Sequence, residues 1–146
     1  MPKARKKKEN YLKKKKPFRE EFLWLLLLGL WMAGIFIASS TEGSGEHYYD
    51  LKMLIERKGA HVFEFFVLAY LFWKVLRYSV SNFKMIFVFT SLFSLAYAVS
   101  DELHQLFVFG REGKFSDIGI DCIGIFIFLF AIALFKKIPK QKIPQR

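Results

Sequence analysis

Polar side chains interrupt a very hydrophobic chain in two places. The first is residues 100–124, a stretch between two hydrophobic segments that contains carboxylates, an amide and a guanidinium: Asp101, Glu102, Gln105, Arg111, Asp117 and Asp121. The second is Lys58, His61 and Glu64, which follow one another at intervals of three residues. Carboxylates and imidazole can bind a divalent cation, transfer a proton or hold a charged ligand group. These nine residues are therefore the candidate functional site.

The spacing of the first three polar residues places them on one side of a helix. At about 100° of rotation per residue, Asp101, Glu102 and Gln105 fall within an arc of about 100°. His104 lies outside this arc, on the far flank. We therefore expect one helix to present two carboxylates and an amide to a common side.

Two further polar stripes are expected on other helices. Asp117 and Asp121 are four residues apart, so they share a helix face, and Asp121 lies about 6 Å further along the axis. Lys58, His61 and Glu64 form a stripe that drifts around its helix because their step is three residues. All three stripes start at the same end of the expected bundle.

The elements that position these residues are hydrophobic segments. The chain has 146 residues, of which 53% are hydrophobic and 18% aromatic, which is a membrane composition for a single domain. Four segments reach the length of about 17 residues that a membrane-spanning helix needs: Phe22 to Ala38, Gly59 to Leu76, Phe83 to Val99 and Ile118 to Phe135. The predicted fold class is all-α, an integral membrane bundle of four transmembrane helices.

Charge predicts the orientation of the bundle. The net charge of +10 comes largely from a basic tail, residues 1–20, which holds ten Lys and Arg residues. A second basic tail, residues 139–146, follows the membrane domain of residues 21–138, and the short connection at 77–82 is also basic. Basic segments beside membrane helices accumulate on the cytoplasmic side. We therefore expect a multi-pass protein of the cell membrane with both termini in the cytoplasm, and no nucleic-acid partner.

The polar end carries more negative than positive groups. Lys58 and Arg111 are the cations, and five carboxylates oppose them: Glu64, Asp101, Glu102, Asp117 and Asp121. With His61 neutral, the set has a charge of −3. Ionised groups near hydrocarbon are costly unless they are paired or hydrated. The excess negative charge would be removed by protonation of some carboxyls, by a bound divalent cation or by a cationic ligand group. Oxygen ligands favour Mg²⁺ or Ca²⁺ over Zn²⁺.

Each polar residue also has a structural interpretation. Asp101, Glu102 and Asp117 lie at expected helix ends, where a carboxylate caps a helix or stays solvated, and Asp117 suits an N-cap. Asp121 lies a turn inside its span, so it is either functional or paired, with Arg111 as the expected partner.

The remaining polar residues have structural alternatives too. His61 suits a hydrogen-bonded residue of the bundle core, and Glu64 suits a pair with Lys58 or His61. Gln105 suits a hydrogen bond between helices.

The pattern resembles the VanZ-like family. Its matching features are Ser39-Ser40 at the end of the first helix, Lys58-x-x-His61, Asp101-Glu102-x-x-Gln105-x-Phe107, Gly110-Arg111, and Asp117-x-x-x-Asp121-x-x-Gly124. The resemblance covers nearly the whole chain after the basic tail. It implies a four-helix membrane protein associated with low-level resistance to the lipoglycopeptide teicoplanin.

Three classes of function remain open. The first is an envelope protein that binds an external group, such as a lipid headgroup or a peptidoglycan precursor. The second is a membrane enzyme, with or without a metal, that transfers or hydrolyses a phosphoryl or acyl group on a lipid-linked substrate, with His61 or an acid as proton carrier. The third is a small transporter. It would need polar groups through the midplane, whereas the helices are apolar below Glu64 and Asp121 unless an oligomer supplies a path.

Overall fold

The protein is a bundle of four helices. The computed structural model describes residues 18–41, 51–111 and 113–135. Its helices are α2 (Phe18–Ser39), α3 (Leu51–Ser79), α4 (Phe83–Gln105) and α5 (Phe115–Leu134), and the described residues contain no strand. The predicted all-α fold is confirmed. Most of both basic tails lies outside the described residues, so the predicted boundaries of the tails stay predictions.

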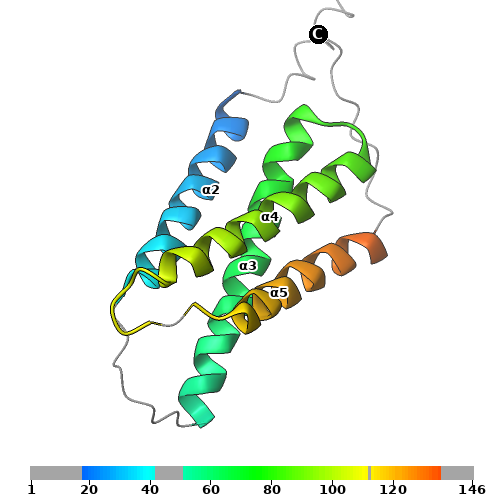
Figure 1. Ribbon diagram of the computed structural model, residues 1–146. Helices are drawn as coiled ribbons and strands as arrows, with labels where there is room; N and C mark the ends of the chain where they lie inside the picture. Colours follow the sequence, from blue (N-terminus) through cyan, green and yellow to red (C-terminus); the bar gives the residue numbers. More distant parts are fainter. Residues whose placement is uncertain (1–17, 42–50, 112, 136–146) are drawn as a thin grey trace, which may run out of the picture.

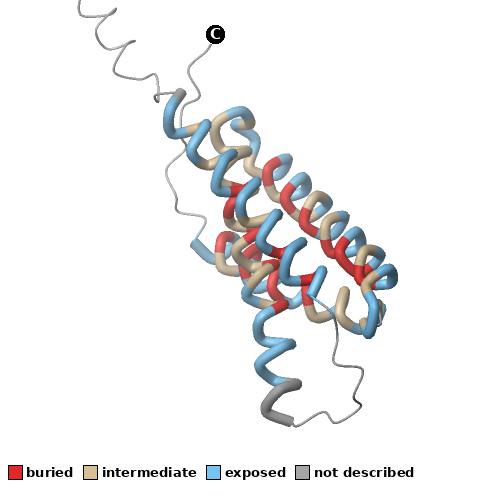
Figure 2. Tube along the Cα trace, turned by 90° about the vertical axis from the view of Figure 1, so that its left-hand side faces the viewer, coloured by how far each residue is buried: buried red, intermediate tan, exposed pale blue. Residues whose placement is uncertain are grey.

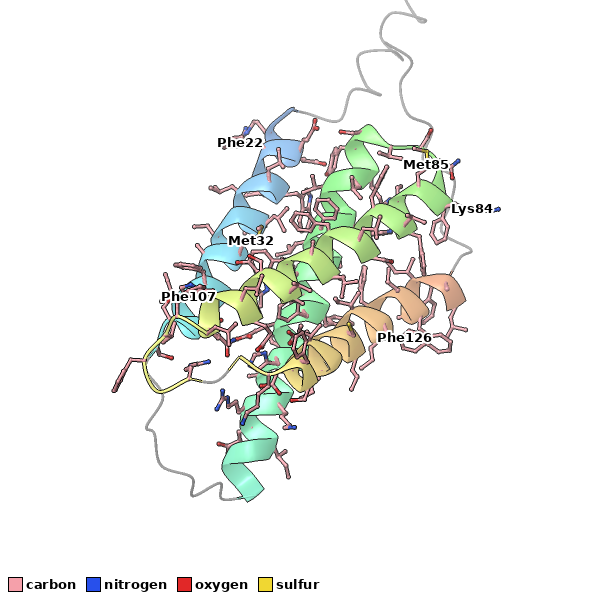
Figure 3. All side chains as sticks on the ribbon, viewed as in Figure 1. Phe22, Met32, Lys84, Met85, Phe107 and Phe126 are labelled. Carbon is pink, nitrogen blue, oxygen red and sulfur yellow. The ribbon has the colours of Figure 1, made fainter. Side chains whose placement is uncertain are left out.

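The surface of the bundle is that of a membrane protein. All four helices are long and apolar enough to cross a bilayer. Large hydrophobic side chains are exposed along them, among them Phe22 and Phe126, whose side chains point away from the bundle in Figure 3. A soluble monomer rarely exposes an apolar surface of this extent, whereas lipid covers it without cost. The chain is a multi-pass membrane protein.

Helices α3 and α4 form the centre of the bundle. Each contacts the other three helices, whereas α2 and α5 make no contact with each other within the described ranges, and α3 makes the more extensive contacts. The most extensive contact of α3 is with α5. There the buried ring of Phe128 packs edge-on against Phe66, Tyr70 and Trp73 of α3. Consecutive helices run in opposite directions (Figure 1), so the C-terminal ends of α2 and α4 meet the N-terminal part of α3 and the start of α5. This meeting point is called the polar end below.

The helices extend further than their hydrophobic segments. Helix α3 begins at Leu51, before the hydrophobic segment that starts at Gly59, and its first turns project beyond the bundle (Figures 1 and 2). Likewise α4 continues past Val99 to Gln105, so one helix carries Asp101, Glu102 and Gln105 as expected. Three of the six residues added to α4 are good helix formers, namely Glu102, Leu103 and Gln105. In the turn beyond the helix, Gly110 adopts a φ of 73°, a conformation that favours glycine.

The opposite end of the bundle is basic and aromatic. The ammonium of Lys74 lies 5.0 Å from the ring centre of Trp24 and 5.3 Å from that of Tyr70. The guanidinium of Arg77 lies 4.7 Å from the ring centre of Trp73. Aromatic rings with basic side chains are typical of the interface between hydrocarbon and water. The two ends of the bundle therefore differ in charge, basic at one end and acidic at the other.

Candidate functional site

The polar end assembles most of the predicted site residues from three helices and one loop. Helix α3 contributes His61 and Glu64, α4 contributes Asp101, Glu102 and Gln105, and α5 contributes Asp117 and Asp121. Arg111 comes from the loop between α4 and α5. Lys58 lies one turn before His61 and is exposed. The buried residues among them fall into two separate groups.

The first group is the buried triad, defined as His61, Glu102 and Asp121. Their exposed fractions are 7%, 4% and 0%. Nδ1 of His61 lies 3.0 Å from Oδ1 of Asp121, which joins α3 to α5. The backbone N–H of Lys114 donates to Oε2 of Glu102 at 2.9 Å, which ties the end of α4 to the start of α5. One potential ligand atom from each of the three residues lies within 4.8 Å of the other two.

Two carboxylate oxygens of the triad have no hydrogen-bond partner. They are Oε1 of Glu102 and Oδ2 of Asp121, and both are buried. A buried polar atom without a partner costs about 1–3 kcal/mol, and more when it carries charge. Native structures contain few such atoms, so two carboxylate oxygens in one cluster call for an explanation, such as an ion or a proton. The triad can accept a cation or exchange a proton.

The second group is the Asp101 network, defined as Ser39, Thr41, Asp101, Gln105 and Arg111. Ser39 Oγ donates to Asp101 Oδ1 at 2.6 Å, and Gln105 Nε2 donates to Asp101 Oδ2 at 2.9 Å. The Arg111 guanidinium in turn contacts Gln105 Oε1 at 3.5 Å. Both oxygens of Asp101 are therefore satisfied, and the network connects α2, α4 and the loop. Its hydrogen bonds are sufficient to explain a structural role.

The predicted pair between Arg111 and Asp121 is wrong. The guanidinium donates from Nε to the carbonyl oxygen of Thr41 at 2.9 Å, and from Nη2 to the carbonyl of Ala38 at 3.0 Å and the Thr41 hydroxyl at 2.9 Å. The last carbonyls of a helix have no partner within the helix and attract cations. Arg111 therefore caps the C-terminal end of α2. The residue that contacts Asp121 is His61.

Two acidic residues lie beside the triad without joining it. Glu64 is half-buried, and among the described residues it forms no ion pair with Lys58 or His61, so that predicted pairing is wrong. Its backbone carbonyl accepts a hydrogen bond from Trp31 Nε1 at 3.0 Å. Asp117 lies in the first turn of α5, but the N-cap position belongs to Lys114. The prediction of Asp117 as N-cap is therefore wrong by three residues.

Sequence reasoning missed several polar contacts. Ser40 Oγ lies 2.9 Å from Nε2 of His104, whose ring stacks on Phe36 at 4.3 Å between centres. His104 therefore connects α4 to α2. The polar residues after Ala38 are the one sequence signal for these contacts, since they follow directly on a hydrophobic span.

The middle of α4 is more polar than expected. Thr90 and Ser94 are fully buried, and neither hydroxyl has a hydrogen-bond partner. The prediction that the helices are apolar below Glu64 and Asp121 is therefore wrong for α4. Hydroxyls are neutral, however, and neither Thr90 nor Ser94 adds an ionisable group to a path across the bundle.

Comparison with known proteins gives one match. The model of the family described as VanZ/LLP1 matches residues 22–136, which includes all four helices and the whole polar end. Searches of curated proteins and of solved structures each found no match.

Proposed function

The chain belongs to the VanZ/LLP1 family, and on this premise we propose that it is a cell-membrane protein whose polar end faces outward and binds or modifies a cell-envelope component. The observation that carries the proposal is the buried triad with its two unpartnered carboxylate oxygens. A structural ion pair would satisfy both carboxylates, as the network around Asp101 does. The triad instead leaves two carboxylate oxygens available to a ligand at one end of the bundle.

Charge supports the outward orientation. Lys74, Arg77 and Lys84 lie at the end opposite the triad, and most residues of both basic tails adjoin that end in the sequence. Under the positive-inside rule that end and both termini are cytoplasmic. The polar end that contains the triad then faces the compartment in which peptidoglycan precursors and outer-leaflet headgroups are found.

The charge of the polar end suggests what it binds. Four carboxyl groups lie around the imidazole of His61, those of Glu64, Glu102, Asp117 and Asp121. The guanidinium of Arg111 is hydrogen-bonded to the end of α2 instead. A ligand that brings a cationic group, or a cation that bridges to a phosphate, complements this excess. Both a lipid headgroup and a peptidoglycan precursor fit this description.

The test uses drug tolerance. Expression of the chain in a susceptible Gram-positive host should raise the minimum inhibitory concentration of teicoplanin more than that of vancomycin, because teicoplanin carries a lipid tail that uses the membrane. The Asp121→Asn variant should lose this protection. The Glu20→Gln variant, which neutralises an exposed carboxylate at the opposite end of the bundle, should keep it.

The outcomes separate the proposal from its alternatives. Equal protection against both drugs, or full protection by Asp121→Asn at matched protein levels in the membrane, would contradict a role of the site in teicoplanin tolerance. Absence of any protection would reject teicoplanin resistance as the function of this chain. Protein level and membrane insertion are measured for every variant.

A second candidate function is catalysis on a lipid-linked substrate. The observation in its favour is the 3.0 Å contact between His61 and Asp121, because a carboxylate that orients an imidazole is a common arrangement for proton transfer. Mass spectrometry of lipids and lipid-linked precursors from cells with wild-type or His61→Gln protein tests it. A product that depends on His61 supports an enzyme, and unchanged composition supports a binding protein. A transporter has less support, since Thr90 and Ser94 add only neutral groups in mid-span.

A further inference from the structure

We propose that His61, Glu102 and Asp121 bind one divalent first-row transition metal ion, with manganese and zinc as the best candidates. The site uses Nδ1 of His61, from which the ion displaces a proton, together with the carboxylate of Asp121 and the unpartnered Oε1 of Glu102. The proposal names a cofactor for the same polar end, and its functional meaning rests on the proposed function above. Metal binding itself is measured without any envelope ligand.

The two carboxylates are held differently. Glu102 accepts the backbone N–H of Lys114 with Oε2 and leaves Oε1 free. Metal-binding carboxylates are usually held in this way by a neighbouring hydrogen bond, which fixes the direction of the free oxygen. Asp121 Oδ1 lies 3.0 Å from Nδ1 of His61, and Oδ2 has no partner. Two neighbouring ligand atoms of one ion are also about 3 Å apart, so both groups can bind the same ion once the proton between them is displaced.

Distances and burial agree with a metal site. Ligand atoms of the triad lie within 4.8 Å of one another. Two ligands about 2.0–2.2 Å from one ion are at most about 4.4 Å apart, so a small movement closes the site. The free oxygens Oε1 of Glu102 and Oδ2 of Asp121 have no partner, so no direct hydrogen bond with a shared proton joins them. A cation between them removes the cost of burying two unpartnered carboxylate oxygens.

The donor set selects the class of metal. Mg²⁺ and Ca²⁺, the ions expected from the carboxylates alone, prefer oxygen ligands. The structure adds His61, and an imidazole nitrogen favours a transition metal, while carboxylates also suit Mn²⁺. Three protein ligands leave at least one position for water or a substrate oxygen, as in catalytic metal sites.

The experiment measures metal binding by the purified full-length chain in lipid nanodiscs. The protein is treated with a chelator, reloaded with Mn²⁺ or Zn²⁺ in separate samples, freed of excess ion, and analysed by inductively coupled plasma mass spectrometry. We expect one ion per chain, and weaker retention of Mg²⁺ and Ca²⁺. His61→Gln, Glu102→Gln and Asp121→Asn should each weaken binding by about tenfold or more. Glu20→Gln, a control at the opposite end of the bundle, should bind like the wild type.

A second measurement does not depend on the folding of variants. Pulsed electron paramagnetic resonance of the Mn²⁺-loaded wild type should detect the nuclear coupling of a directly bound imidazole nitrogen. The proposal is overturned if neither Mn²⁺ nor Zn²⁺ binds stoichiometrically, if no nitrogen coupling is seen, or if Glu20→Gln loses the ion as the triad variants do. Metal binding without drug tolerance would overturn the proposed function alone, and tolerance without metal would overturn this inference alone.

Discussion

At the scale of single residues, two neighbouring carboxylates have different environments. Asp101 and Glu102 are adjacent and both buried, yet Asp101 has both oxygens hydrogen-bonded and Glu102 has one oxygen free. Adjacent helical residues point about 100° apart, so the two carboxylates face different neighbours. Asp101 faces the end of α2, and Glu102 faces the start of α5. Helix rotation therefore separates a structural carboxylate from a candidate ligand.

Arg111 is expected to be irreplaceable by lysine. Its guanidinium bonds the carbonyls of Ala38 and Thr41 and the Thr41 hydroxyl together, whereas an ammonium is a point charge without the fork of donors. Partial burial lowers the pKa of Arg111, but the guanidinium stays charged at physiological pH. Arg111→Lys should reduce the free energy of unfolding by about 1–3 kcal/mol, measured by SDS titration in mixed micelles with tryptophan fluorescence.

The control for this prediction is Arg57→Lys, a substitution of the same type at an exposed position of α3. It should change stability by no more than about 0.5 kcal/mol, because surface substitutions rarely exceed that value. If Arg111→Lys is as stable as Arg57→Lys, the hydrogen bonds at the end of α2 contribute little to stability.

At the scale of elements, the contact between α3 and α5 sets the geometry of the triad. His61 lies on α3 and Asp121 on α5, so their distance depends on how closely these helices approach. The two helices approach closely at Gly124, where an added Cβ would overlap the carbonyl oxygen of Val62. Small residues permit such contacts between membrane helices. Gly124 lies one turn from Asp121 and therefore keeps the triad together.

Gly124→Ala is expected to separate the two helices. The obstacle is backbone, which cannot rotate away, so the helices must shift and the contact between His61 and Asp121 must lengthen. We expect a loss of about 1–3 kcal/mol of stability, as for overpacked cores, together with loss of metal binding at the triad. SDS titration and metal analysis measure both effects.

Gly119→Ala is the matched control on the same helix. No atom lies within 4 Å of a Cβ built at Gly119, so this substitution should be neutral or stabilising by up to about 1 kcal/mol. Equal effects of Gly119→Ala and Gly124→Ala would show that helix propensity, and not the close approach, accounts for the result.

At the scale of the whole molecule, the bundle is polarised along its axis. Its middle exposes hydrophobic side chains to lipid, one end gathers Lys74 and Arg77 with aromatic rings, and the other end contains the buried triad. Exposed Phe107 and Phe109 lie in the loop at the triad end, and Figure 3 shows Phe107 projecting there. Aromatic rings at both ends suit the two interfaces of a bilayer.

This polarity predicts which end of the bundle reacts with a thiol reagent that is added outside the cell. Cys122 is the only cysteine, so Cys122→Ser provides a background for single reporters. Phe109→Cys, at a side chain that is 84% exposed, should react with a membrane-impermeant thiol reagent in intact cells. Ser81→Cys, exposed in the connection between α3 and α4, should react only after the membrane is opened. The reverse pattern would contradict the proposed orientation and, with it, an external site.

The amino-acid sequence by itself determined the fold class and the elements that carry the polar residues. Hydrophobic segments of sufficient length fold as helices in a bilayer because only a helix or a closed barrel satisfies the backbone there, so four helices followed from composition and length. Helix periodicity also placed Asp101, Glu102 and Gln105 on one buried side. Helix boundaries were less well predicted, because hydrophobicity ends at the membrane whereas α3 and α4 continue beyond it.

Only the tertiary structure decided which polar residues are partners. The sequence suggested Arg111 for Asp121, since opposite charges attract and nothing in the spacing excludes the pair. In the fold, the unsatisfied carbonyls at the end of α2 bind Arg111, and the close approach at Gly124 brings His61 to Asp121. Which residues become partners depends on the distances between helices. The helical periodicity of the sequence gives no information about these distances. Those same distances leave one oxygen each of Glu102 and Asp121 free, and so distinguish a candidate binding site from a set of structural ion pairs.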